Sequence, residues 1–379
     1  MPNSPILFFT TVLLALVFSM GEATQPYDVS SSNTSHINYT TVTGYFLQDD
    51  PATDPSTFDY TKLNLGLINR TYPSDDTFPS PSPSSPSTTQ ATPSTPPTQW
   101  QRFAHHVSQL NRHAAPTVRY KVLVMGRHGE GDHNVAEAFY GTPAWDCHWS
   151  LRDGNGTSVW ADARLTPAGV AQARVAHAFW AGALGAGGDE GSARIPAPER
   201  YYVSPLARCL ATAEHTFGGL EEGGLLPPGR PFRPVVKELL RESLGLHTCD
   251  RRSSRTWIAE NYPGWEIEEG FAEEDELWSA TLRESSTAQI ARLKTFLDDI
   301  FTHDPDSTFI SLTSHSGSIR SLLKAVGHRD FSLLTGAVIP VLIRAETLLG
   351  PAPPTTIDPP TTAPTCTVDP TAAAGSGAV

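Results

Sequence analysis

The stretch YKVLVMGRHGE, residues 120–130, decides the fold, because an apolar run leads directly into an Arg-His pair. Residues 120–125 have the length and the apolar character of a buried strand. Arg127 and His128 then lie at the carboxyl end of that strand, where open α/β sheets bind ligands. An arginine presents a planar fork of donors to a phosphate, and a neutral imidazole can attack phosphorus. The alternative is a strand that ends in two solvated polar residues.

Helix and strand patterns alternate between residues 99 and 350. Such alternation predicts an α/β fold, a three-layer sandwich whose mostly parallel central sheet carries helices on both faces. The expected helices cover residues 100–110, 166–184, 206–217, 275–303 and 316–326. The further strands are expected at residues 200–204, 234–240, 308–313 and 337–345. We expect the last of these at an edge of the sheet, since Pro340 has no N–H to donate to a neighbouring strand.

The amino terminus has the pattern of a targeting signal. Residues 1–23 are predicted to be a cleaved signal peptide, because an apolar stretch is followed by small residues at Gly21 and Ala23; an uncleaved anchor is the alternative. No other stretch is long and apolar enough to cross a bilayer, so no stable membrane span is expected. Four N-glycosylation sequons begin at Asn33, Asn38, Asn69 and Asn155. We therefore expect a secreted, extracellular protein.

The segments on either side of the domain at residues 99–350 differ from it in composition. Residues 24–72 are polar, yet they contain enough β-branched and aromatic residues to dock as an amino-terminal arm. Residues 73–98 and 351–379 are rich in Pro, Ser and Thr. Segments of this kind bury too little apolar surface to offset the entropy of ordering them. We expect a disordered linker at 73–98 and a disordered tail at 351–379.

Charge and cysteine content restrict the possible partners. The formal net charge of −13 argues against a nucleic-acid partner, although local arginines can still make a cleft positive. Cys147 and Cys249 lie in loop-like segments and are one candidate disulfide, but the sequence does not choose among the pairings, and buried free thiols are the alternative. No CxxC spacing indicates zinc, and we expect neither a metal nor another cofactor. The four cysteines are Cys147, Cys209, Cys249 and Cys366.

Two further polar clusters follow predicted strands. Ser204, at the end of the strand at 200–204, begins a cluster that includes Arg208, and His315 follows the strand at 308–313. Because the carboxyl ends of parallel strands meet at one edge of a sheet, we expect these side chains to lie beside Arg127 and His128.

The three clusters together resemble the histidine phosphatase superfamily, also called the phosphoglycerate mutase-like family. The resemblance covers residues 120–345, and segments 44–51 and 247–250 are similar to a fungal branch. The matching motifs are Arg127-His128-Gly129 with Asn134, Leu165-Thr166-Pro167-Ala168-Gly169 with Gln172-Ala173, Ser204-Pro205-Leu206 with Arg208 and Thr212, Leu240-Arg241-Glu242, and Ser314-His315-Ser316-Gly317.

The resemblance implies a role for each polar residue of the site. His128 is the implied nucleophile, and Asn134 an additional neutral donor to the substrate. Glu242 is expected to protonate the leaving oxygen and later to deprotonate the attacking water, with Glu238 and Glu130 as alternatives. The phytase branch carries Asp directly after its second His, where this chain has Ser316, which favours Glu242. The residues that surround the phosphoryl oxygens are expected to be Arg127, Arg208 and His315.

These observations predict a phosphomonoester hydrolase that acts on a small phosphorylated substrate through a phosphohistidine. A phosphomutase of the same family is the first alternative, since both reactions use the same side chains. A catalytically silent module that binds phosphorylated ligands is the second. The arginines of residues 251–275 could bind a second anionic group of the substrate, or they could be ordinary surface charges.

Overall fold

The computed structural model describes residues 35–79, 96–184, 192–367 and 369–371. Its centre is a seven-stranded sheet with the order β1-β7-β2-β6-β3-β4-β5. The strands from β2 to β5 in this order are parallel, whereas β7 runs antiparallel to β2 and to β1. The strands are β1 (Ser35–Thr41), β2 (Val118–Arg127), β3 (Arg200–Val203), β4 (Pro234–Val236), β5 (Glu266–Ile267), β6 (Phe309–Ser314) and β7 (Val338–Leu349).

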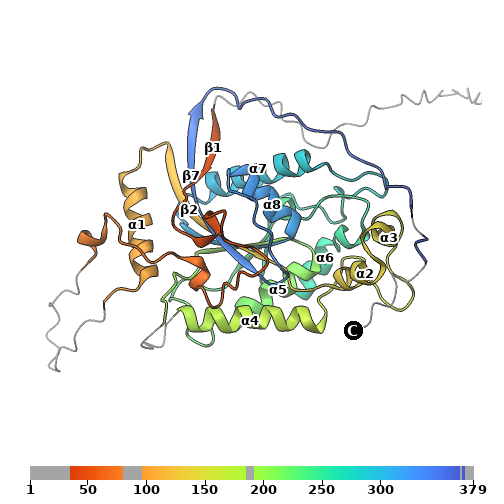
Figure 1. Ribbon diagram of the computed structural model, residues 1–379, viewed down its shortest axis with the longest axis horizontal. Coiled ribbons are helices and arrows are strands. Elements are labelled where there is room, and N and C mark those ends of the chain that lie inside the picture. The colour runs from red at the N-terminus through yellow and green to blue at the C-terminus, as the bar shows by residue number, and fades with distance from the viewer. Residues whose placement is uncertain (1–34, 80–95, 185–191, 368, 372–379) are drawn as a thin grey trace, which may run out of the picture. The chain divides into compact units, whose positions relative to one another are not determined.

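Helices cover both faces of the sheet, which confirms the predicted three-layer α/β fold (Figure 1). Neighbouring side chains of a strand point to opposite faces of the sheet, so β2 contributes side chains to a hydrophobic core on each face. Leu123 and Met125 pack with α7 and α8, whereas Val122 and Val124 pack with α1, α4 and α5. Each large apolar side chain buried there contributes about 1.5–3 kcal/mol. The helices are α1 (Gln99–His113), α2 (Asp132–Tyr140), α3 (Thr142–Cys147), α4 (Pro167–Leu184), α5 (Ala207–Phe217), α6 (Arg255–Asn261), α7 (Ser286–His303) and α8 (Ser316–Ala325).

Three of the predicted elements are corrected by the structure. β7 is not an edge strand, because β1 pairs along its outer side and Pro340 lies opposite Val124 in the interior of the sheet. The helix expected from residue 275 begins only at Ser286, where the Ser285 hydroxyl accepts a hydrogen bond from the Ala288 N–H and caps the first turn. The strand expected at 234–240 ends at Val236 and is followed by a 3-10 turn.

The arm before α1 packs on the domain through aromatic side chains. Phe46 lies fully buried against Trp100 and Phe103, with ring centroids 6.0 and 5.5 Å away. The Ser74 hydroxyl lies 3.3 Å from Nδ1 of His106 on α1, so the linker expected at 73–98 is ordered at its start. Residues 80–95 of that linker, and the predicted signal peptide at 1–23, lie outside the described residues.

The segment after β7 is also ordered, contrary to the expected disordered tail. We call residues 351–367 the C-terminal strap; Figure 1 shows it passing from the end of β7 to α3. Its Thr361 exchanges two main-chain hydrogen bonds with Arg283, of 2.7 and 2.9 Å. Cys366 forms a disulfide with Cys147, so the candidate pairing of Cys147 with Cys249 is wrong. Within the described part of the chain, no helix is both long and apolar enough to cross a membrane.

Candidate active site

Three parallel strands bring the predicted site residues to one edge of the sheet. Arg127 at the end of β2 is paired in register with Ser314 of β6, so His128 and His315 follow side by side. Ser204 continues from β3, and its N–H donates to the Thr313 carbonyl at 3.0 Å. The register of the sheet therefore places His128, His315 and the start of α5, which carries Arg208, at the same edge.

His128 is buried and oriented for attack through one nitrogen. Its Nδ1 donates to the Gly129 carbonyl at 2.7 Å, so Nε2 is the nitrogen left to meet a substrate. Burial, followed by the charges of Arg208 and Arg127, holds the pKa of His128 well below its ordinary value. The imidazole is therefore neutral at physiological pH, which is the form that a nucleophile needs.

The loop after His128 owes its shape to two glycines in contact. A Cβ atom on Gly129 would lie 2.3 Å from the Gly169 carbonyl oxygen, and one on Gly169 would lie 2.0 Å from the Glu130 carbonyl oxygen. The N–H of Gly129 donates to the Thr212 hydroxyl of α5 at 3.0 Å. These contacts explain why the first motif, the Thr-Pro-Ala-Gly motif and Thr212 occur together.

The second histidine faces the first. The rings of His315 and His128 have centroids 5.2 Å apart, and His315 is fully buried. Its Nε2 lies 2.7 Å from the Ser204 hydroxyl and 3.4 Å from Sγ of Cys209, and its Nδ1 lies 3.8 Å from the same sulfur. Burial, then the charge of Arg208, holds the pKa of His315 well below its ordinary value, so this imidazole is also neutral.

The two arginines are held from outside the pocket. Arg208 is 1% exposed and donates to the Cys249 carbonyl at 2.6 Å and to the Asp250 carboxylate at 2.8 Å. Burial alone would lower the pKa of Arg208, but the facing Asp250 carboxylate raises it, and the guanidinium stays charged. Arg127 donates to the Leu333 carbonyl at 2.7 Å. Nε of both arginines is buried without a hydrogen-bond partner, so each retains a donor for an anion.

Among the three candidate carboxylates, only Glu242 reaches the residues beside His315. Its Oε2 accepts from the Gly317 N–H at 2.9 Å, and a Cβ on Gly317 would lie 2.1 Å from Oε1. Glu238 is engaged in ion pairs with the guanidinium groups of Arg241 and Arg252, each at 2.8 Å. Glu130 accepts a hydrogen bond from the Thr166 hydroxyl at 2.6 Å. The geometry therefore favours Glu242 as the proton donor, although its role stays a prediction.

Asn134 lies in the first turn of α2. Its Oδ1 accepts from the Gly131 N–H at 2.9 Å, so the side chain caps the helix. The predicted donation from its amide nitrogen to a substrate stays a prediction.

Sequence reasoning missed two residues of this cluster. His133 is buried, and its ring centroid lies 5.4 Å from that of His128. Its position directly before Asn134, inside the first motif, was the available signal. Asp250 binds Arg208 across 42 residues, and no local pattern indicates such a pair.

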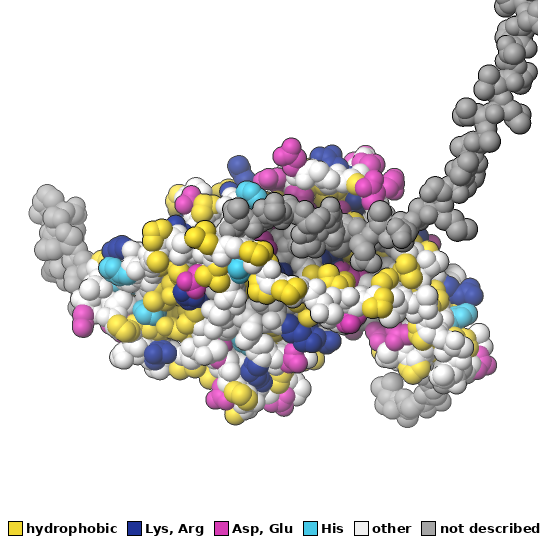
Figure 2. All heavy atoms as spheres, turned by 90° about the horizontal axis from the view of Figure 1, so that it is seen from above, with side chains coloured by type: hydrophobic (Ala, Val, Ile, Leu, Met, Phe, Trp, Pro, Cys, Tyr) yellow, Lys and Arg dark blue, Asp and Glu magenta, His cyan; other side chains and the backbone are white. Residues whose placement is uncertain are grey.

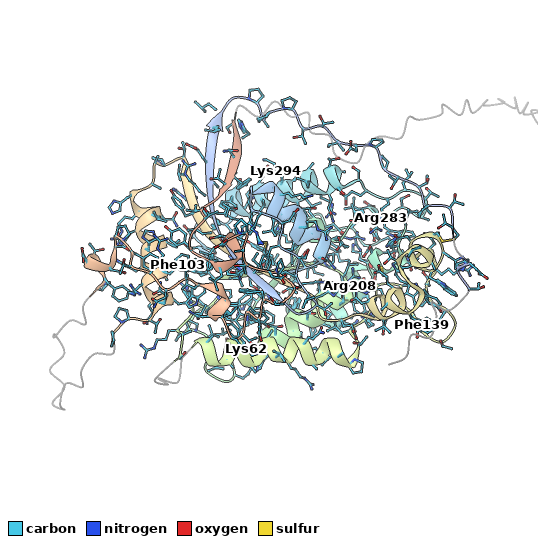
Figure 3. All side chains as sticks on the ribbon, viewed as in Figure 1. Lys62, Phe103, Phe139, Arg208, Arg283 and Lys294 are labelled. Atoms are coloured by element: carbon cyan, nitrogen blue, oxygen red, sulfur yellow. A yellow bond between two sulfur atoms is a disulfide. The ribbon has the colours of Figure 1, made fainter. Side chains whose placement is uncertain are left out.

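Of the charged groups of the site, Arg208 is buried, and Arg127 and Glu242 are partly buried. Figure 2 shows acidic and basic side chains interspersed on the face that it presents, without a continuous basic area there. Figure 3 places Arg208 and Arg283 on the side of α2 and α3, away from Phe103 on α1. Arg252, from the segment proposed to bind a second anion, donates to Glu238 and to backbone carbonyls, so it stabilises the loop instead.

One group among the described residues has the composition of a metal site. The ligand atoms of His247, Cys249 and Asp250 lie within 4.8 Å of one another. Asp250, however, is bound to Arg208, and burial raises the pKa of the Cys249 thiol well above its ordinary value. A guanidinium in contact with the carboxylate also repels a cation. These residues are better suited to supporting Arg208 than to holding a metal.

The chain belongs to the histidine phosphatase superfamily (branch 1), whose family model matches residues 123–337. A protein of Arthroderma benhamiae, named probable phosphoglycerate mutase, is 56% identical over 311 residues, which are 82% of this chain and 85% of that protein. A phosphomutase-like protein 3 of Candida albicans is 38% identical over 227 residues, 60% of this chain and 66% of that protein. The solved ecdysone phosphate phosphatase from Bombix mori is 17% identical with a TM-score of 0.37, over 63% of this chain and 95% of that chain.

Proposed function

We propose that this protein is a phosphomonoester hydrolase that works through a phosphohistidine on His128. The observation that carries the proposal is the juxtaposition, at one sheet edge, of two buried neutral imidazoles and two guanidinium groups whose Nε atoms have no partner. Cations and neutral donors in a buried pocket stabilise a phosphoryl group as its charge shifts during transfer.

The positions of the side chains support a reaction in two steps. Nε2 of His128 attacks phosphorus, and the bond from phosphorus to the ester oxygen breaks as Glu242 gives that oxygen a proton. Glu242 then takes a proton from water, whose oxygen attacks the phosphohistidine and releases inorganic phosphate. Arg127, Arg208 and His315 contact the non-bridging oxygens in both steps, and Asn134 adds a neutral donor.

A phosphomutase is the second candidate, because relatives of this chain carry the name probable phosphoglycerate mutase. In that reaction the phosphoryl group returns from His128 to the substrate instead of going to water. We favour hydrolysis because the amino-terminal sequence has the pattern of an export signal, whereas central metabolic mutases work in the cytosol.

We also propose that the protein is secreted and glycosylated. The Cys147–Cys366 disulfide supports this proposal, since disulfides persist mainly in oxidising compartments. Asn38, Asn69 and Asn155 are exposed, so their sequons are accessible to the glycosylation machinery. Treatment of protein from culture medium with an N-glycosidase should lower its apparent mass, and protein retained wholly inside cells would contradict the proposal.

The experiment that tests the function measures both possible products. Purified protein is incubated with a panel of phosphomonoesters that includes 2- and 3-phosphoglycerate, and inorganic phosphate and isomerised ester are quantified together. Steady release of phosphate supports the hydrolase, and isomerisation without release supports the mutase. His128→Ala should abolish turnover and the phosphoenzyme while keeping the fold, whereas His106→Asn, a change at a buried histidine of α1, should keep turnover. Normal activity of His128→Ala would remove the proposed nucleophile.

A further inference from the structure

A third imidazole lies in the site beside the two that the motifs supply. His133, in the first turn of α2, is 9% exposed, and its ring centroid is 5.4 Å from that of His128. Burial, followed by the charges of Arg208, His128 and Arg127, holds its pKa well below the ordinary value. The same cationic groups that surround His128 therefore surround His133, and the ring is neutral.

The two nitrogens of the His133 ring have different surroundings. Nδ1 is fully buried and has no hydrogen-bond partner. This edge of the ring faces Gly131 so closely that a Cβ atom there would lie 2.8 Å from Nδ1 and 2.9 Å from Cε1. A proton on Nδ1 would be a buried donor without an acceptor, which costs about 1–3 kcal/mol. The proton therefore belongs on Nε2, at the opposite edge of the ring.

Hydrogen bonding among the described residues does not explain a buried polar ring at this position. No hydrogen bond from His133 to a described residue is present, so the imidazole holds neither a loop nor a helix end. Buried polar groups are nearly always paired, so a ring with its proton on Nε2 and no protein acceptor for that proton is suited to an anionic partner in this cationic pocket. The neighbouring unpaired donors, Nε of Arg127 and Nε of Arg208, point to the same kind of partner.

We propose that His133 is a further catalytic residue, which donates its Nε2–H to a non-bridging oxygen of the phosphoryl group that His128 receives. This inference rests on the proposed function only in requiring a phosphoryl group at His128, so it holds for a hydrolase and for a mutase. The ligand class at this position is a tetrahedral or trigonal-bipyramidal oxyanion of phosphorus. Gly131 acts as a positioning residue, because any side chain there would displace the ring.

The test compares one substitution that removes the donor with one that keeps a donor. His133→Phe keeps a planar ring of similar volume without a donor, and His133→Gln keeps a donor on a flexible chain. We expect His133→Phe to lower the rate of phosphoenzyme formation and the affinity for orthovanadate by about 10²-fold, the usual loss for one oxyanion donor. His133→Gln should recover part of both losses. A packing role predicts the opposite order, with His133→Phe better than His133→Gln, and that order would overturn the inference.

Gly131→Ala gives an independent route to the same result. The added methyl group should displace the ring and weaken vanadate binding in a chain that still contains His133. In the double variant with His133→Phe, it should cause no further loss, because both changes remove one interaction. Additive losses would show that Gly131 acts elsewhere.

The outcomes also separate this inference from the proposed function. If His128→Ala is inactive while His133→Phe binds vanadate and forms the phosphoenzyme as the unaltered protein does, only the role of His133 is lost. If the unaltered protein forms no phosphoenzyme with any substrate, the proposed function itself fails.

Discussion

Replacement of Glu242 by glutamine should reveal a proton donor through its dependence on the leaving group. Three donors hold the carboxylate: Oε2 accepts from the Gly317 N–H at 2.9 Å, and Oε1 accepts from the Ser243 N–H at 2.9 Å and from Nε2 of Gln289 at 3.0 Å. A glutamine amide must turn its NH₂ group toward Gly317 or toward Ser243, and both are backbone donors. Glu242→Gln therefore loses the proton and also one hydrogen bond, which costs about 1–3 kcal/mol locally.

The size of the effect depends on how much the leaving oxygen needs a proton. General acid catalysis by a positioned side chain contributes about 10²–10⁴-fold. In an alkyl phosphate such as glycerol phosphate the leaving group is a strongly basic alkoxide, so kcat/KM for this substrate should fall by that factor. In an aryl ester such as p-nitrophenyl phosphate the leaving group is a stabilised phenolate, so kcat/KM for this substrate should fall by less than about tenfold. Since kcat/KM covers steps up to the first irreversible one, it reports formation of the phosphoenzyme.

The other two carboxylates supply matched controls. Glu238→Gln weakens the ion pairs with Arg241 and Arg252, and Glu130→Gln alters the contact with Thr166. Both changes should leave the ratio of alkyl to aryl kcat/KM unchanged, whatever they do to stability. Equal losses of kcat/KM for the two substrates in Glu242→Gln would refute the role of Glu242. A changed ratio in one of the controls would indicate that the carboxylate altered in that control is the proton donor.

Three further predictions follow from buried or close-packed groups. Burial, then the charge of Arg283, lowers the pKa of His247 to about 4, so its unfolded form takes up a proton first on acidification. The contribution of His247 to the free energy of unfolding is then fully present above about pH 6.5, and it is lost at up to about 1.4 kcal/mol per pH unit as the pH falls toward 4. Urea unfolding should show a smaller slope of this free energy with pH in His247→Asn. Cys366→Ser should release the C-terminal strap and remove at most about 5 kcal/mol, seen as faster hydrogen exchange at residues 351–367; unchanged exchange would mean that the hydrogen bonds suffice. Gly169→Ala places a methyl group 2.0 Å from a backbone carbonyl oxygen and should cost about 1–3 kcal/mol and most of the activity, whereas Gly182→Ala on the same helix meets open space and should be harmless; equal effects would disprove the close contact.

The sequence predicts where His128, Arg208 and His315 lie in the fold, because each comes shortly after a strand with an apolar pattern. Residues 120–125 lie within β2 and residues 309–313 within β6, and the parallel register places His128 beside His315. A strand exit is a local feature, and parallel pairing puts such exits at one edge of the sheet. The fold class and the juxtaposition of the motif residues could therefore be inferred from short segments alone.

The elements that prediction missed depend on contacts between distant parts of the chain. Ser35 of β1 is paired with Leu349 of β7, so the position of β7 inside the sheet is set by residues more than 300 positions away. The C-terminal strap has the composition of a disordered segment, but a disulfide across 219 residues and main-chain bonds to Arg283 hold it. Composition measures what a segment can bury by itself, and it does not include such attachments.

Arg208 shows where motif reasoning stops within the site itself. Its spacing after Ser204 indicates an arginine at the sheet edge. The orientation of its side chain, however, is set by Asp250, which lies in a loop 42 residues later in the sequence. Nη1 and Nη2 each donate to one partner, the Cys249 carbonyl and the Asp250 carboxylate, so the guanidinium keeps further N–H donors, the unpaired Nε among them, for the substrate. A buried arginine without Asp250 would face the full cost of burying an uncompensated charge. The carboxylate therefore keeps Arg208 charged inside the protein, and this requirement can be recognised only once the loop is folded against α5.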